Sequence, residues 1–202
     1  MIKNKEGKYM LNLKLKKDVF KESLKFGQEN NIGVRGHADG GIEEQLIGIL
    51  GQNIICDALD LPLMTANGFD GGVDINLNNT DIDIKTMGRK VYPKPSYVNN
   101  LIASQLEYNA DAYLFCSYHK TDYVLTICGW IDKESFKKKA KFYNEGEVRG
   151  RSDGTSFKTK ANLYEIENKE LSEINTLNDL KQVGMSLIQK IKRRQLDGKG
   201  NY

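Results

Sequence analysis

Apolar and polar residues alternate on both sides of an Asn-Asn pair in the segment from Asp70 to Lys85. Alternation with a period of two is typical of a half-buried β-strand, and two such runs joined by two Asn residues predict a β-hairpin. With Asn78 and Asn79 in the turn, Asp74 lies directly opposite Asp83. Because side chains alternate between faces, the predicted polar face holds Asp74, Asn76, Asp81, Asp83 and Lys85, and the predicted core face holds Val73, Ile75, Leu77, Ile82 and Ile84.

The acidic residues of this hairpin require an explanation, because strands are normally poor in Asp. Two carboxylates directly opposite each other, such as Asp74 and Asp83, repel when nothing lies between them. A hard divalent cation between them would turn this repulsion into ligation, since Mg²⁺ and Ca²⁺ select carboxylate and carbonyl oxygens. The alternative interpretation is an edge hairpin whose acidic residues face solvent.

Predicted helices and strands alternate along the rest of the chain. Apolar spacing predicts helices at 18–30, 42–59, 96–109, 133–142 and 177–195. Apolar or alternating runs predict further strands at 9–15, 112–117, 123–131 and 163–166. The expected N-caps are Asp18, Ser96 and Asp132, and the expected loops are 33–41, 87–95 and 145–160. This order predicts an α/β (α+β) fold with a mixed central β-sheet flanked by helices.

We expect one domain over residues 1–202, with a core at about 42–131. The strand and helix at the N-terminus and the helix at the C-terminus would be additions to this core. The chain has 202 residues and a formal charge of +3, a mildly basic balance that permits nucleic-acid binding.

The three cysteines predict a reducing environment. Cys56, Cys116 and Cys128 lie in apolar surroundings without CxxC spacing, which is typical of reduced core residues and not of disulfides or zinc sites. The first residues have no apolar segment of the secretory type, and no uncharged apolar run is long enough to cross a bilayer. We therefore expect a cytoplasmic protein with no membrane partner.

An acidic residue on a helix, an Asp on one strand and Asp-x-Lys on the next resemble the PD-(D/E)XK nuclease superfamily. Asp74 matches the first acidic residue of that motif, and Asp83-Ile84-Lys85 matches its (D/E)XK part. Val73 stands where the family usually has proline. The similarity runs from about residue 43 to residue 131 and implies a restriction-endonuclease-like fold.

The resemblance also implies a set of site residues. Asp74, Asp83 and the backbone carbonyl of Ile84 would hold Mg²⁺ or Mn²⁺, and Lys85 would orient the attacking water. Glu44 is the expected acidic residue of the helix, with its neighbour Glu43 as the alternative; the number of metal ions stays open.

Two features after the hairpin extend this resemblance. Gln105 is predicted in a helix, where some relatives carry a glutamine facing the site, although a solvated position is the alternative. Basic and aromatic residues follow Lys85 directly and would suit a nucleic-acid backbone and unstacked bases. They are Arg89, Lys90, Tyr92, Lys94 and Tyr97. An ordinary polar loop is the other interpretation of this segment.

The implied function is a metal-dependent nuclease that hydrolyses phosphodiester bonds, most simply a DNA endonuclease. Cutting both strands of a duplex would favour a two-fold homodimer. Two other functions fit the same residues. One is a catalytically inactive nucleic-acid-binding module of the same fold, and the other is a non-enzymatic protein stabilised by Ca²⁺.

Overall fold

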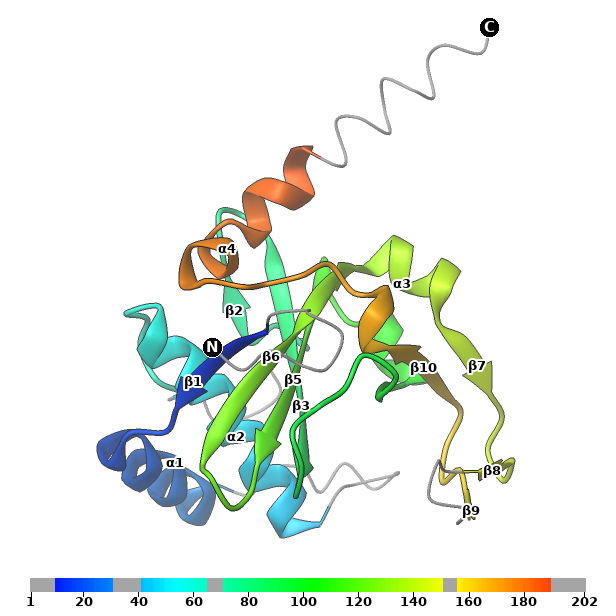
Figure 1. The fold of residues 1–202 in the computed structure, drawn as a ribbon, viewed down its shortest axis with the longest axis horizontal. Helices are drawn as coiled ribbons and strands as arrows, with labels where there is room; N and C mark the ends of the chain where they lie inside the picture. The colour runs from blue at the N-terminus through cyan, green and yellow to red at the C-terminus, as the bar shows by residue number, and fades with distance from the viewer. Residues whose placement is uncertain (1–9, 31–40, 65–70, 151–155, 190–202) are drawn as a thin grey trace, which may run out of the picture.

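The computed structural model describes residues 10–30, 41–64, 71–150 and 156–189. Its centre is a mixed five-stranded sheet in the order β1-β6-β5-β3-β2 (Figure 1). The strands are β1 (Leu11–Lys14), β2 (Ile75–Asn76), β3 (Asp81–Arg89), β5 (Ala112–His119) and β6 (Val124–Asp132). Strands β3 and β5 run parallel, and the other neighbours run antiparallel. The α/β (α+β) class and the mixed central sheet are therefore confirmed.

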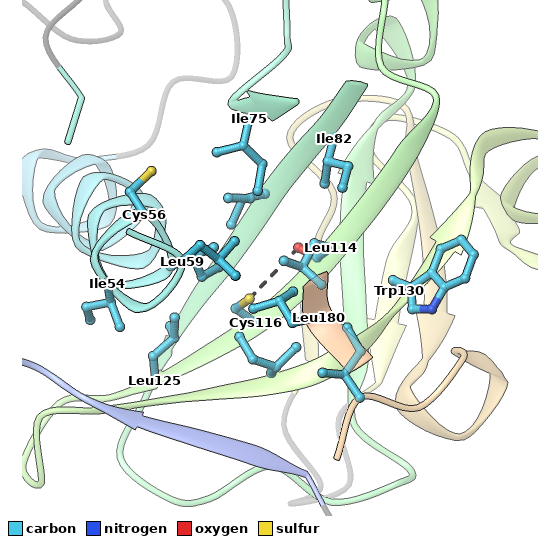
Figure 2. Close-up of a cluster of buried hydrophobic side chains, with 14 of the residues drawn as sticks. Ile54, Cys56, Leu59, Ile75, Ile82, Leu114, Cys116, Leu125, Trp130 and Leu180 are labelled. Atoms are coloured by element: carbon cyan, nitrogen blue, oxygen red, sulfur yellow. Dashed lines mark hydrogen bonds between the residues drawn. The ribbon is translucent and has the colours of Figure 1, made fainter. Parts of the chain in front are cut away.

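Helices α1 (Lys17–Glu29) and α2 (Ile42–Ala58) lie on one side of this sheet (Figure 1). They form because each carries apolar residues that the sheet can bury, and α2 is apolar around most of its surface. Figure 2 shows Ile54 of α2 near Leu125, with Ile82 and Leu114 in the same cluster of buried side chains. The buried Asn53 amide donates to Ser23 Oγ of α1 at 2.9 Å, so the polar atoms between the helices are satisfied.

Two glycines of α2 differ in the space around them, which allows a matched test of the helix packing. A Cβ built on Gly51 would lie 2.7 Å from Thr86 Cβ of β3, whereas a Cβ on Gly48 would meet nothing within 4 Å. Gly51→Ala should therefore destabilise the protein by about 2 kcal/mol through overpacking. Gly48→Ala should be neutral or stabilising by up to about 1 kcal/mol, because alanine favours the helix. Urea unfolding of both variants measures the difference, and equal free energies of unfolding would contradict the close approach of α2 to β3.

The opposite face of the central sheet carries a second, smaller sheet in the order β4-β10-β7 (Figure 1). It consists of β4 (Val98–Ile102), β7 (Lys141–Tyr143) and β10 (Leu163–Glu167). Aromatic side chains fill the space between the two sheets, with the Phe136 ring of α3 (Lys133–Lys139) 5.1 Å from the Tyr113 ring. This face is the one that receives the side chains of Asp83 and Lys85, because Ile82 and Ile84 point into the core beneath α2.

The shorter elements complete the chain. They are η1 (Ala103–Glu107), β8 (Val148–Gly150), β9 (Ser156–Lys158), η2 (Asn168–Glu170) and α4 (Leu177–Lys181). Strands β8 and β9 pair only with each other among the described strands. The Asn78 amide donates to the Lys181 carbonyl at 3.0 Å, so the segment containing α4 docks on the turn of the hairpin.

The predicted helix at 96–109 is wrong. The chain forms β4 and η1 there, because β4 pairs with β10, a strand more than 60 residues later. Alternate residues of β4 are buried, and Asn99 donates to Asn168 Oδ1 at 2.7 Å. A ladder with so distant a partner is invisible to local apolar spacing, which can be read either as a strand or as a helix.

Several boundaries differ from the predictions in smaller ways. Asp18 lies in the first turn of α1 and does not cap it, whereas Asp132 caps α3 by accepting from the Ser135 N–H at 2.9 Å. Strand β3 extends through the first residues of the predicted loop at 87–95, and the predicted loop at 145–160 contains β8 and β9. The predicted helix at 177–195 is interrupted by a turn at Gln182. The predicted loop at 33–41 lies almost entirely outside the described residues.

Within the described ranges, no helix combines the length and the apolar character that a membrane span requires. The organisation of the whole chain as one domain stays a prediction.

Candidate functional site

The turn of the hairpin forms as predicted. Asn78 and Asn79 have φ angles of 52° and 59°, the positive values that a type I′ turn requires at both central residues. Leu77 and Thr80 exchange backbone hydrogen bonds of 3.0 and 3.1 Å across it. Ile75 then pairs with Ile82 and Asn76 with Asp81, which is the predicted register.

The paired segment ends at Ile75, one residue before the predicted pair of Asp74 and Asp83. In an antiparallel ladder, hydrogen-bonded and non-hydrogen-bonded pairs alternate, and the pair of Asp74 and Asp83 would be a non-hydrogen-bonded one. In such a pair, the Asp74 N–H would point away from β3. The Asp74 N–H instead donates to the Ile82 carbonyl at 3.0 Å. The Asp74 carboxylate accepts from the Ile84 N–H at 2.6 Å, so it takes the place of a paired strand along this edge. The expected direct opposition of Asp74 and Asp83 is therefore replaced by a side-chain cap on the edge of β3.

The backbone of Asp74 is held from a second side. Gln52 of α2 donates from its side-chain amide to the Asp74 carbonyl at 3.1 Å. The N–H and the carbonyl of a strand residue point to the same edge. The Ile84 carbonyl therefore faces the edge where its N–H meets Asp74. Asp74 and the Ile84 carbonyl, two of the predicted ligands, thus lie at one edge of β3.

Asp83 and Lys85 form an ion pair on the neighbouring face of β3. The Lys85 Nζ lies 2.8 Å from Asp83 Oδ1, and the Asp83 side chain is only 2 % exposed. The Lys85 side chain is 22 % exposed, so its ammonium group connects a buried carboxylate with solvent. A carboxylate this deeply buried needs a charged partner, and Lys85 supplies it.

Tyr113 is the nearest neighbour of Asp83 on β5. The parallel register pairs these two residues, and both side chains project from the same face. Burial raises the pKa of Tyr113 well above its usual value, and the charges of Asp83 and Glu107 raise the pKa further. Tyr113 is therefore a neutral phenol beside the buried carboxylate.

The structure does not bring either helical glutamate to Asp83. Glu44 accepts from the Gly41 N–H at 2.7 Å and so caps the start of α2, and Glu43 pairs with Lys120 at 2.8 Å. The Ile47 side chain lies against Gly88, so α2 begins near the far end of β3. Gly88 is five residues beyond Asp83, which corresponds to about 16 Å along a strand.

The other predicted residues of the region are placed as follows. Gln105 lies in η1, within the connection from β3 to β5. Arg89 donates to the Val98 carbonyl at 2.8 Å and lies 4.9 Å from the Tyr97 ring centroid. The Tyr92 hydroxyl donates to Asp122 at 2.7 Å. Arg89, Tyr92 and Tyr97 thus make internal contacts, whereas Lys90 and Lys94 are exposed.

The segment that leads to Asp74 packs against the connection between β3 and β5, a contact that the alternation of the hairpin does not predict. Gly71 and Gly72 both have positive φ, and the Asn109 N–H donates to the Gly71 carbonyl at 3.1 Å. The Tyr108 side chain lies directly on Gly72. The Gly-Gly pair in the sequence was the available signal for this close approach.

The donor set suits one kind of metal ion. In the described parts of the chain, no group of three or more His, Cys, Asp or Glu side chains could hold a metal. Two carboxylates and a backbone carbonyl are all oxygen donors, and Mg²⁺ is commonly bound through one or two carboxylates together with water. The fully buried Tyr113 hydroxyl, which has no hydrogen-bond partner in the described residues, adds a further polar atom beside Asp83. In chemical type, these oxygen donors match Mg²⁺ or Mn²⁺ and differ from the His and Cys ligands that zinc prefers.

Comparison of the chain with protein-family models, curated proteins and solved structures finds no match.

Proposed function

We propose that this protein is a metal-dependent nuclease of the PD-(D/E)XK type that hydrolyses phosphodiester bonds in DNA as an endonuclease. The observation that carries the proposal is the arrangement on β3, where a buried Asp83 pairs with Lys85 beside the edge capped by Asp74. The connectivity supports it, because the antiparallel β2–β3 hairpin is followed by a crossover into the parallel strand β5. The proposed restriction-endonuclease-like core covers residues 42–131.

Each residue has a proposed role. Asp74, Asp83 and the Ile84 carbonyl would hold Mg²⁺ or Mn²⁺. When bound, the ion supplies a Lewis acid for the phosphodiester and a water molecule of lowered pKa. Lys85 is exposed enough to reach a phosphate oxygen, and its charge would offset the negative charge that grows in the transition state. The ligand set omits Glu44, because its carboxylate caps α2.

The proposal extends to the setting of the reaction. Cys56, Cys116 and Cys128 are buried cysteines that form no disulfide in the described part of the chain, which fits a reducing cytoplasm.

A two-fold homodimer would let two sites cut both strands of a duplex, and light scattering of the purified protein measures the oligomeric state.

Incubation of supercoiled plasmid with the purified protein tests the activity. Wild type is expected to nick or linearise the plasmid with Mg²⁺ or Mn²⁺ and to leave it intact in EDTA. Asp83→Asn should reduce cleavage by about 10³-fold, because it removes a ligand charge from the site. Asp57→Asn is the matched control, since Asp57 pairs with the exposed Lys16 at the other end of α2.

Two results would overturn the proposal. Cleavage that persists at the wild-type rate in Asp83→Asn would place the activity elsewhere or in a contaminant. Tight DNA binding in EDTA, with no cleavage in any divalent metal, would favour the catalytically inactive nucleic-acid-binding module.

A further inference from the structure

The Tyr113 hydroxyl is buried without a hydrogen-bond partner among the described residues. The side chain is 0 % exposed, and in the described ranges its Oη is a buried polar atom that has no hydrogen-bond partner. Buried hydroxyl groups are nearly always hydrogen-bonded, because leaving one unpaired is costly. An exception of this kind indicates either a bound water molecule or a partner that arrives with a ligand.

The position of the ring ties this hydroxyl to the candidate site. Tyr113 is paired with Asp83 across the parallel strands, and both side chains project from the face that carries the second sheet. The Tyr113 ring packs against Phe136, at 5.1 Å between centroids, and against Phe115, at 6.3 Å, and these two rings are in turn 5.9 Å apart. Contact with these two rings, together with complete burial, keeps the Tyr113 hydroxyl away from solvent.

The chemistry of the pair gives the hydroxyl one role. A phenol is protonated at neutral pH and can donate a hydrogen bond, whereas an ionised carboxylate can only accept. Asp83 Oδ1 receives the Lys85 ammonium at 2.8 Å, and each carboxylate oxygen has more than one lone-pair direction. Carboxylates that ligate metals are in turn commonly held by hydrogen-bond donors in a surrounding layer.

We propose that Tyr113 is a positioning residue whose hydroxyl donates to the Asp83 carboxylate, directly or through one water molecule, when Asp83 holds a divalent cation. The inference rests on the proposed function and adds a residue to its site. Tyr113 fixes the orientation of Asp83 at the time when the substrate phosphate competes for Lys85.

Titration of the metal-free protein with Mn²⁺ in a calorimeter tests this role without any assay of activity. Tyr113→Phe keeps the ring and removes only the hydroxyl. The Kd for Mn²⁺ should rise about 10-fold or more, which is the usual effect of losing a hydrogen-bond partner of a metal ligand. The melting temperature without metal should stay the same or rise by about 2 to 4 °C, because an unsatisfied buried hydroxyl has been removed.

Tyr118→Phe is the matched control. Tyr118 is buried on the same strand but belongs to the core cluster on the opposite face, so its Kd for Mn²⁺ should stay at the wild-type value. Asp83→Asn should lose Mn²⁺ binding, and it serves as the positive control because it removes a proposed metal ligand.

The outcomes separate this inference from the proposed function. A folded wild type that binds no Mn²⁺ overturns the proposed metal site. Wild-type affinity in Tyr113→Phe, together with loss in Asp83→Asn, overturns the role of Tyr113 alone. A third outcome is a lower melting temperature in metal-free Tyr113→Phe together with an equal loss of Mn²⁺ affinity in Tyr118→Phe. That outcome would show that removing either hydroxyl disturbs the fold, and it would also overturn the positioning role of Tyr113.

Discussion

Lys85→Met is expected to lower DNA cleavage by about 10³-fold and the free energy of unfolding by about 3 kcal/mol. The loss of activity follows from the proposed role, because the ammonium group that offsets charge on the phosphate is removed. The loss of stability follows from burial, since Asp83 is 2 % exposed and loses the ammonium 2.8 Å away. Breaking a buried pair costs about 3 to 5 kcal/mol, and the partial exposure of Lys85 places this pair at the lower end. Plasmid cleavage and urea unfolding measure the two effects.

The double variant Asp83→Asn, Lys85→Met separates these effects. Without the buried carboxylate, removal of the ammonium no longer leaves a charge behind, so the double variant should regain most of the stability lost by Lys85→Met. It should remain inactive. The two substitutions should therefore have non-additive effects on stability, because the two residues contact each other. No such recovery is expected for cleavage. If cleavage returned together with stability, Lys85 would act through folding and have no direct role in the reaction.

Gly72→Ala is expected to cost about 3 kcal/mol of stability and to reduce cleavage about 100-fold. Gly72 has a φ of 78°, and a Cβ built there would lie 2.6 Å from Tyr108 Cβ and 2.9 Å from Tyr108 Cγ. Tyr108 Cβ and Cγ lie next to the Tyr108 backbone and cannot turn away, so an alanine side chain would be overpacked. The positive φ adds a second cost, because an L-residue with a Cβ is strained in the left-handed region. The backbone of Asp74, two residues later, would shift, and a displacement of about 1 Å at a reacting group can cost 100-fold in rate.

Gly146→Ala is the control for the strain alone. Gly146 has a φ of 79°, and a Cβ there would meet nothing within 4 Å. It should cost about 1 kcal/mol and leave cleavage at the wild-type rate. Similar losses of stability in the two variants would mean that Tyr108 yields easily and does not hold the segment before Asp74.

The hairpin shows how much of the site local sequence can specify. Two Asn residues accept positive φ, and alternation fixes the face of every residue in the paired segment, so the turn, the register and the shared face of Asp81, Asp83 and Lys85 were predictable. The course of Asp74 was not predictable. It depends on the Gln52 amide of α2 and on the Tyr108 ring against Gly72, which approach from segments about 20 to 35 residues away.

The connection between β3 and β5 and the start of α2 show the opposite case. The spacing of Val98, Leu101 and Ile102 fits one face of a helix as well as a strand, and pairing with β10 decides the outcome. From the sequence, Glu44 or its neighbour Glu43 was expected to be the acidic residue that α2 contributes to the site. The direction of the helix relative to β3 instead places Glu43 beside Lys120 and leaves Glu44 as a cap.

The sequence by itself determined the helices α1 and α2, the strands β5 and β6, the hairpin turn and the shared face of Asp83 and Lys85. These features depend on residues within a few positions of one another, where apolar spacing and turn preferences act directly. Only the tertiary structure decided that Tyr113 stands beside Asp83, that Asp74 caps the edge of β3 at the Ile84 N–H, and that Glu44 lies apart from them. Such contacts depend on which distant segments pair and pack together, and local patterns do not encode that choice.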